Sequence, residues 1–278
     1  MTKKIQTGPL FLVLAALMWS SAGVVIKSVA WDGIAIAALR GTLCVIALSV
    51  FLRPFPMKLN KVKVITAFCY FAQGVLYILA NKYTTAANAT MLQYTSTLYI
   101  ILFTALATKK LPKKLDVIAS VVLLGGIALA FVGTTESGGM VGNIMALVSA
   151  LFYAGVFYCS RLEGANTIDS MVLGNAMYMV LLPFMLTNPV VLSSPIQDWL
   201  LAGTYGLIGG FGAWLCFAKG IKTTPSLKAN FITMLEPVLA PVWTFLILGE
   251  TITVWSLLGA VVVIGGILAY NTLQEKAS

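Results

Sequence analysis

The chain has 278 residues, of which 59% are hydrophobic and only 10% are charged. Ordinary globular chains carry about 25% charged residues, so this composition excludes a soluble domain and indicates a polytopic membrane protein. The formal net charge of +9 is attributed to membrane topology and contact with anionic lipids, and nucleic-acid binding is excluded because the sequence leaves no room for a basic extramembrane domain.

Ten transmembrane helices are expected, because a hydrocarbon core of about 30 Å takes roughly 20 apolar residues per helix. The longest connection, RPFPMKLNKVK after the second span, is too short for a separate catalytic or nucleotide-binding domain. The predicted spans lie near residues 9–29, 33–52, 63–81, 86–107, 115–133, 140–160, 168–187, 196–218, 226–248 and 253–273.

The two halves of the chain are expected to form inverted repeats. Residues 80–129 align with residues 220–269 at a constant offset of 140, which pairs VVLLGGI with VVVIGGI. Because each half has an odd number of spans, the second half must insert upside down. We therefore expect an all-α protein with a first five-helix repeat at residues 1–134 and a second, inverted one at 139–274. Inverted repeats around a midplane site are a recurring plan of secondary transporters.

The distribution of positive charge predicts the orientation in the membrane, since short cytoplasmic loops collect Lys and Arg. With the N-terminus inside, 15 of the 18 Lys and Arg residues fall on the cytoplasmic side. Only Lys27, Arg40 and Lys82 fall on the outer side. We expect a multi-pass protein of the cell membrane, plasma or inner, with both termini in the cytoplasm.

The chemical inventory of the chain argues against an enzyme or a metal protein. There is no His and no Cys-x-x-Cys motif, and the few carboxylates are scattered along the sequence, which disfavours nitrogen- or sulfur-ligated metal sites. No G-x-x-x-x-G-K-[ST] motif is present to bind nucleotide phosphates. We expect no catalytic residues, no metal, no cofactor and no ATP-driven transport.

Glu236 is the most unusual residue, because TMLEPVLAPVW places its carboxyl group inside the ninth span. An ionisable group within the membrane is a functional hypothesis by default, and this one would suit proton coupling or the binding of a cationic substrate. Pro237 and Pro241 each remove a helical hydrogen-bond donor, so carbonyl groups one turn earlier could face a cavity. The alternative is that Glu236 only braces this broken helix through fixed hydrogen bonds to a neighbour.

Arg40 is the second outlier, roughly a third of the way into the second span from the outer face. It could bind a substrate carboxylate with two parallel hydrogen bonds, pair with Asp32 at the outer mouth, or extend outward to the interface. If Arg40 and Glu236 line one cavity, together they would complement a zwitterion such as an amino acid.

Glycines mark the candidate packing surfaces. In GTYGLIGGFGAW of the eighth span, Gly206 and Gly210 have the small-residue spacing that lets helices approach closely. Close packing is one reading of this pair, and bending or sliding during a conformational switch is the other. Gly125, Gly126, Gly265 and Gly266, on the fifth and tenth spans, are expected to form a scaffold or a dimer face.

Polar and aromatic side chains inside spans complete the candidate site. The fourth span is the densest, and facing lipid would be unfavourable for so many polar groups, so at least one side of this helix should line a wet cavity. The other candidates for substrate binding or coupling are Trp19, Tyr77, Gln93, Tyr94, Tyr99, Tyr153, Tyr178, Trp214 and Trp243.

These features resemble the EamA transporters of the drug/metabolite transporter superfamily. The similarity covers nearly the whole chain through AALRGT, NKYTTAANATMLQYTSTLYI and KGIKTTPSLKANFITMLEPVLAPVWTFLILGE. Arg40, Leu235-Glu236-Pro237 and Gly249-Glu250 match family motif positions. The first copy departs from the pattern, with Thr97 and Lys110 where relatives tend to have Pro and an acidic residue, which leaves Glu236 unpaired in the bundle.

The resemblance implies a carrier of small organic metabolites with a basket-like ten-helix bundle, a central cavity and no use of ATP. Family members handle amino acids, nucleotides, vitamins, sugars and drugs, so the family does not define the substrate. We expect alternating access by a monomer or homodimer, with export favoured and protons as the candidate coupling ion. The alternatives are an uncoupled uptake facilitator and a flippase or scramblase for lipid-linked substrates.

Overall fold

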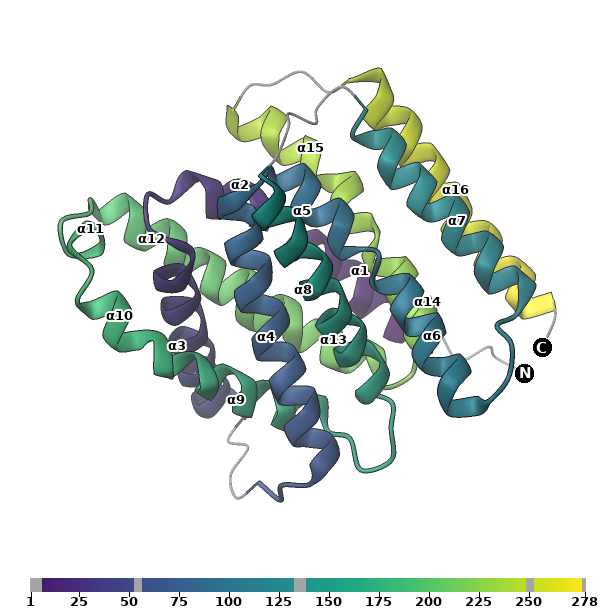
Figure 1. The fold of residues 1–278 in the computed structure, drawn as a ribbon, viewed down its shortest axis with the longest axis horizontal. Helices are drawn as coiled ribbons and strands as arrows, with labels where there is room; N and C mark the ends of the chain where they lie inside the picture. Colours follow the sequence, from purple (N-terminus) through teal and green to yellow (C-terminus); the bar gives the residue numbers. More distant parts are fainter. Residues whose placement is uncertain (1–6, 53–56, 133–138, 249–252, 277–278) are drawn as a thin grey trace.

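The structure, a computed structural model, describes residues 7–52, 57–132, 139–248 and 253–276. Every secondary-structure element in these ranges is a helix (Figure 1). Eight of the helical segments are long and apolar enough to cross a membrane. This confirms the prediction of an all-helical, multi-pass membrane protein.

The first half of the chain forms five spans, two of which are interrupted. The first and fourth predicted spans each consist of two shorter helices, whereas the second, third and fifth are continuous. The elements are α1 (Thr7–Trp19) with α2 (Ala22–Ser28), α3 (Gly33–Leu52), α4 (Lys61–Tyr83), α5 (Ala86–Gln93) with α6 (Ser96–Thr108), and α7 (Lys114–Ala130).

The second half repeats this layout with different interruptions. Its eighth span contains a π-helical segment, η2, in the glycine-rich stretch, and its seventh span contains a short 3-10 segment, η1. The elements are α8 (Met140–Cys159), α9 (Thr167–Tyr178), η1 (Met179–Leu181), α10 (Leu182–Leu186), α11 (Pro189–Leu192), α12 (Ile196–Thr204), η2 (Tyr205–Gly212), α13 (Ala213–Ile221), α14 (Ser226–Thr233), α15 (Leu235–Leu248) and α16 (Val254–Lys276).

Two predicted spans differ from the other eight for physical reasons. The fifth, α7, has 17 residues, which extend about 26 Å at 1.5 Å per residue, slightly less than the hydrocarbon core. The ninth is divided at Met234, just before Pro237, into α14 and α15. A proline lacks the amide hydrogen that a continuous helix requires.

The two halves run in opposite directions through the bundle. In Figure 1, α4 begins at the lower end, while its counterpart in the second half begins at α12 beside α11 and runs downward through α13. One interruption also recurs at the aligned position. Tyr94, after α5, and Met234, after α14, are separated by the offset of 140 that relates the repeats. The break between α1 and α2 is not repeated, because its counterpart α8 is continuous.

Glycines bring neighbouring helices close together. A Cβ atom added to Gly155 of α8 would lie 2.8 Å from Cys69 Sγ of α4, and one added to Gly142 would lie 2.6 Å from the backbone of Thr84. Such small residues allow van der Waals packing between helices that lipid cannot drive together by the hydrophobic effect. Helices α4 and α8 therefore pack side by side at the centre of the bundle (Figure 1).

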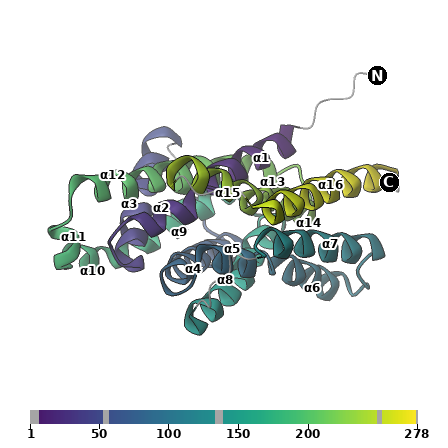
Figure 2. The ribbon, with the colours of Figure 1, turned by 90° about the horizontal axis from the view of Figure 1, so that it is seen from above.

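Helices α7 and α16 form a pair at the edge of the bundle (Figures 1 and 2). Their contact uses Gly126, whose added Cβ would lie 2.9 Å from Val262 Cγ1, and Gly266, 2.8 Å from Leu123 Cδ2. Of the four predicted glycines, Gly125 and Gly265 do not make this contact, since an added Cβ at either would meet nothing within 4 Å. They point outward, so a role for them in a dimer face stays a prediction.

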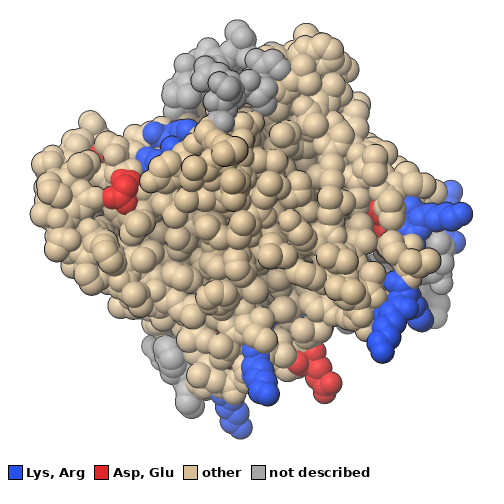
Figure 3. All heavy atoms as spheres, viewed as in Figure 1, with Lys and Arg blue, Asp and Glu red and all other residues tan. Residues whose placement is uncertain are grey.

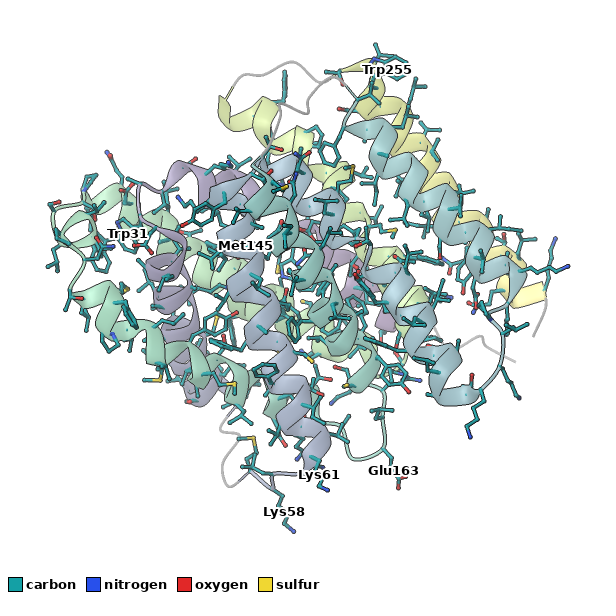
Figure 4. The ribbon with its side chains drawn as sticks, viewed as in Figure 1. Trp31, Lys58, Lys61, Met145, Glu163 and Trp255 are labelled. Atoms are coloured by element: carbon teal, nitrogen blue, oxygen red, sulfur yellow. The ribbon has the colours of Figure 1, made fainter. Side chains whose placement is uncertain are left out.

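The charged side chains visible on the surface in Figure 3 lie toward the ends and edges of the bundle. A broad band without charged atoms crosses the face seen in Figure 3. Lys58, Lys61 and Glu163 lie together at one end, which we call the lysine-rich end, and Trp255 lies at the opposite end (Figure 4). At the lysine-rich end, Lys63 and Asp169 form an ion pair of 2.6 Å that joins α4 to α9.

Candidate functional site

A cavity in the middle of the bundle is lined by residues from both halves of the chain. Its volume is about 30 Å³, enough for one or two water molecules. The space is therefore far smaller than a typical site for a small organic ligand. Seven of the predicted residues line it, and the full set is Trp19, Ala22, Arg40, Gln73, Gly74, Tyr77, Gln93, Tyr153, Tyr205, Gly209, Trp214 and Glu236.

The interruptions in the helices meet at this cavity. Trp19 ends α1, Gln93 ends α5, Gly209 lies in the π-helical η2, and Glu236 lies in the first turn of α15. Trp19 Nε1 donates a hydrogen bond of 3.0 Å to the Gly209 carbonyl. Discontinuous helices free backbone groups that can face a ligand, and transporter binding sites are commonly built from them.

Glu236 is held by two tyrosines of the first repeat. Its Oε2 lies 2.8 Å from Tyr94 Oη and its Oε1 lies 3.5 Å from Tyr77 Oη. Pro237 has no amide hydrogen, so it cannot bond to the Thr233 carbonyl four residues earlier. Tyr94 Oη lies 2.6 Å from that carbonyl oxygen. One tyrosine therefore contacts both the buried carboxyl group and the carbonyl that the proline leaves free, so the bracing predicted for Glu236 is present, and the carboxyl group also faces the cavity.

Arg40 is a buried cation, with 2% of its surface exposed. Its Nη1 donates to Tyr178 Oη at 3.0 Å and its Nη2 donates to Tyr70 Oη at 3.4 Å. The guanidinium carbon lies 5.4, 5.7 and 5.8 Å from the ring centres of Tyr178, Tyr70 and Tyr205, in the range of cation–π contacts. Among the residues that the structure describes, no carboxylate pairs with Arg40, and its Nε lacks a hydrogen-bond acceptor.

Two of the three sequence-based interpretations of Arg40 are wrong. Asp32 does not pair with it, because the Asp32 carboxylate accepts hydrogen bonds from the Ala35 amide at 2.8 Å and from Asn188 Nδ2 at 2.5 Å. Arg40 also does not extend to the interface, since it is buried beside the cavity. Binding of a substrate carboxylate is the interpretation that remains, and it stays a prediction.

Glycines make room for Arg40. A Cβ added to Gly74 would lie 2.0 Å from Tyr178 Oη and 2.9 Å from Arg40 Nη1. One added to Gly210 would lie 2.5 Å from Cys44 Sγ, and one added to Gly206 would lie 3.2 Å from Arg40 Cα. Gly206 and Gly210 thus pack η2 against α3 directly beside the cation. This is the close packing predicted for the pair, while its bending or sliding stays a prediction.

An amide cluster forms another wall of the cavity. Gln93 Nε2 donates to Gln73 Oε1 at 3.3 Å and to Ser149 Oγ at 3.1 Å, and Ser149 Oγ donates to the Gln73 carbonyl at 2.9 Å. These bonds connect α5, α4 and α8. The polar stretch of the fourth span therefore turns inward, and Gln93 supplies amide groups at the cavity.

Aromatic rings form the remaining walls. Trp214 lies at the centre, with ring-centre distances of 4.9 Å to Trp19, 4.6 Å to Tyr70 and 6.3 Å to Tyr153. The rings meet edge to face, the arrangement that aromatic pairs prefer. The walls are thus largely apolar, and the charged or amide groups stand at separate points around them.

The other predicted residues occupy different places. Tyr94 and Tyr178 lie behind the cavity walls, bound to Glu236 and Arg40. Tyr99 is half-buried on α6 and does not line this cavity. Trp243 Nε1 donates to Ser20 Oγ at 2.7 Å, at the break between α1 and α2. Pro241 lies inside α15. The motif residues Gly249 and Glu250 lie outside the described part of the chain.

Tyr205 is a cavity residue that the sequence reasoning did not single out. It lines the cavity and faces the Arg40 guanidinium. The sequence could have pointed to Tyr205, because it has the only side chain with a polar atom in the segment YGLIGGFG, which forms η2. Ser149 was missed as well, and a lone serine in the apolar sixth span carries no comparable signal.

The chain is similar to known transporters over nearly its whole length. The model of the EamA-like transporter family matches residues 6–132 and 140–272. An uncharacterized transporter of Archaeoglobus fulgidus is 25% identical over 270 residues, which cover 95% of this chain and 96% of that protein. An uncharacterized transporter of Clostridium kluyveri is 25% identical over 304 residues, which cover 99% of this chain and 96% of that protein. A solved crystal structure that is 18% identical covers 98% of both chains with a TM-score of 0.76, so it shares the fold.

Proposed function

Because the chain belongs to the EamA-like transporter family, a family of multi-pass membrane transporters and not of enzymes, we propose that it carries a small organic solute with a carboxylate group. The observation that carries this proposal is the guanidinium of Arg40, which lines the central cavity without a carboxylate partner in the described part of the chain. A buried charge without a counter-ion is unfavourable. A substrate carboxylate would supply that counter-ion through charge-assisted hydrogen bonds.

The rest of the cavity supports an amino-acid-like substrate. Glu236 lines the same space as Arg40, and Gln73 and Gln93 add amide groups. The carboxyl group and the amide oxygens can accept hydrogen bonds from an ammonium group. The rings of Trp19 and Trp214 would pack against an apolar side chain. The proposal therefore commits to a zwitterion with a hydrophobic part.

Transport by this site needs at least one other conformation. Binding pockets for small molecules typically have volumes of about 300–1,000 Å³, whereas the central cavity has about 30 Å³. Substrate binding therefore requires a conformation in which this cavity is larger. Alternating access then requires states that open to each side in turn, with substrate shifting their populations.

The hydrogen bonds around Glu236 support a proton on its carboxyl group in this arrangement. A tyrosine hydroxyl has a single hydrogen, yet Tyr94 Oη lies within 2.8 Å of Glu236 Oε2 and within 2.6 Å of the Thr233 carbonyl oxygen. If Glu236 were ionised, its carboxylate and the Thr233 carbonyl would both be hydrogen-bond acceptors. Tyr94 has only one hydrogen to donate to the two of them. A protonated Glu236 resolves the conflict, because its hydroxyl donates to Tyr94, which in turn donates to Thr233.

A carboxyl group that holds a proton when substrate is not bound would supply the return step of an exchanger. The proposal is therefore proton-coupled exchange, in which protons move inward and substrate moves outward. It places the lysine-rich end, which includes Lys58 and Lys61, in the cytoplasm, since short cytoplasmic loops collect positive charge. Export is thus favoured over uncoupled uptake.

Arg40 variants test the choice of substrate class. Purified protein is screened by thermal shift against amino acids and against the amines that lack only the carboxyl group, because a ligand that binds the folded state raises its apparent stability. Amino acids are expected to stabilise the wild type more than the matched amines do. Arg40→Ala is expected to weaken amino-acid binding by at least about tenfold, which corresponds to about 1.4 kcal/mol.

Tyr178→Phe is the matched control, since it removes a hydroxyl group bound to Arg40 but keeps the cation. It is expected to retain the preference for amino acids over amines. Equal loss of both ligand classes in Arg40→Ala would contradict the proposal and indicate a structural role for Arg40.

A further inference from the structure

A second cavity, of about 610 Å³, lies at the lysine-rich end between the main bundle and the α7–α16 pair. In Figures 1 and 2, this pair runs beside α6 and α14 along the edge of the molecule. The cavity is far larger than the central one and falls within the range of about 300–1,000 Å³ typical of ligand sites. We call it the edge crevice.

The inner wall of the edge crevice is apolar. It is formed by Ile100, Ile101 and Ala105 of α6 and by Leu227 of α14. Leu111, at the end of the crevice nearest the α6–α7 connection, is 94% exposed. Such a surface favours a hydrocarbon chain over a polar solute, because burying apolar area against water is favourable and burying unpaired polar groups is not.

The outer end of the edge crevice is positively charged. Lys110 and Lys113 line it from the connection between α6 and α7, and Arg161 lines it from the end of α8. The Arg161 guanidinium donates to the carbonyls of Ile221 and Lys222, which holds the cation in place. Figure 3 shows blue side chains gathered at this edge, over the ends of α6 and α7.

Acidic groups of the described residues do not neutralise this end. Asp116 is the carboxylate that lines the crevice, and its Oδ1 accepts a hydrogen bond of 2.9 Å from Tyr270 Oη. Within the described part of the chain, no ion pair joins Asp116 to Lys110, Lys113 or Arg161. Three cations thus face one carboxylate, which leaves the end with a net positive charge.

The edge crevice is separate from the central cavity. Thr97 Oγ1 donates to Asn230 Oδ1 at 2.6 Å, and Asn230 Nδ2 donates to Ser96 Oγ at 3.1 Å. These bonds join α6 to α14, and their residues line neither cavity. No residue lines both cavities. The crevice therefore has a chemistry and a location of its own.

We propose that the edge crevice binds one acidic phospholipid. The headgroup phosphate lies at Lys110, Lys113 and Arg161, and an acyl chain follows the apolar wall past Ile101 and Leu227. Anionic lipids are attracted to basic clusters at the membrane surface, and this cluster continues into an apolar wall that a soluble anion could not use. The bound lipid joins the α7–α16 pair to the bundle.

The test is lipid binding to the full-length protein in detergent, measured by native mass spectrometry and by thermal shift. The probes are phosphatidylglycerol and phosphatidylcholine with identical acyl chains. The wild type is expected to bind phosphatidylglycerol at least about tenfold more tightly than phosphatidylcholine. The double variant Lys110→Ala/Lys113→Ala is expected to lose most of this preference.

Lys58→Ala/Lys61→Ala is the matched control, since it removes two exposed lysines from the same end but outside the crevice. It is expected to keep the preference for phosphatidylglycerol. Ala105→Trp, which fills the apolar wall, is expected to weaken the binding of phosphatidylglycerol while leaving the lysines in place. Equal binding of both lipids by the wild type, or equal losses in the two double variants, would overturn the proposal. Stabilisation by inorganic phosphate equal to that by phosphatidylglycerol would also overturn it, because the site would then bind a soluble anion.

Discussion

Tyr94 connects two features of the ninth span that the sequence presents separately, the carboxyl group of Glu236 and the carbonyl of Thr233 that Pro237 leaves free. Both contacts are short, at 2.8 and 2.6 Å. Since Tyr94 lies directly after α5 in the first repeat, it ties the interruption of one repeat to the aligned interruption of the other. If Glu236 loses its proton, the carboxylate competes for the Tyr94 hydrogen, and the bond to Thr233 weakens. Under the proposed mechanism, the proton on Glu236 would thereby be coupled to the conformation of the helix break.

The substitution Glu236→Gln tests this coupling. An amide donates a hydrogen bond to Tyr94 as a protonated carboxyl group does, but it cannot release a proton. We expect Glu236→Gln to keep the thermal stability of the wild type, while substrate flux in proteoliposomes no longer varies with pH. Flux that keeps the pH dependence of the wild type would rule out Glu236 as the coupling group.

Two tyrosine variants serve as controls for the hydrogen-bond network. Tyr94→Phe leaves both the Thr233 carbonyl and Glu236 without this partner, so it should lower stability by about 1–3 kcal/mol. Tyr77→Phe removes only the longer contact of 3.5 Å to Glu236 and a bond of 2.9 Å to Thr90, and its effect should be smaller.

At the scale of elements, the eighth span combines a π-helical segment with glycines that face α3. The packing is tight at Gly210, where an added Cβ would lie 2.5 Å from Cys44 Sγ and 3.1 Å from Arg40 Cγ. It is relaxed at Gly203, where the nearest atom, Leu43 Cδ1, would lie at 3.8 Å. Replacing each of these two glycines by alanine therefore distinguishes the effect of helix packing on stability from the effect of helix propensity.

We expect Gly210→Ala to destabilise the protein by about 1–3 kcal/mol, as overpacking does, and to weaken substrate binding because it displaces Arg40. Gly203→Ala should be neutral or slightly stabilising, since alanine favours the helix by about 0.5–1 kcal/mol over glycine. Thermal unfolding in detergent measures both effects. Equal responses of the two variants would show that η2 does not pack tightly against α3.

At the scale of the whole molecule, the inverted halves and the lysine-rich end predict which loops face the cytoplasm. Glu163 lies at the lysine-rich end beside Lys58 and Lys61 (Figure 4), and Ser193 lies after α11, one span further along the chain. In intact cells, a membrane-impermeant maleimide is expected to label Ser193→Cys and to label Glu163→Cys only after permeabilisation. The wild type, whose four cysteines are buried or half-buried, measures the background. The opposite labelling pattern would reverse the proposed orientation.

The sequence by itself determined the class of the protein, its spans and the identity of the exceptional residues. An apolar run long enough to cross a bilayer is visible in any single chain, and a charged residue such as Glu236 or Arg40 stands out against it. The prolines of the ninth span also predicted a broken helix near Glu236, and the structure has that break at Met234. These are local properties, readable from composition and spacing.

Only the tertiary structure decided which side chains meet and which way each helix faces. Arg40 and Tyr178 are 138 residues apart in the chain, and helix packing brings them together. Gly126 rather than Gly125 forms the contact with α16, because successive residues point about 100° apart on a helix of 3.6 residues per turn. In a membrane helix that is apolar on every side, no hydrophobic stripe reveals that rotation. Contacts with neighbouring helices determine which side of each helix faces the bundle, and no local sequence pattern in this chain predicts those contacts.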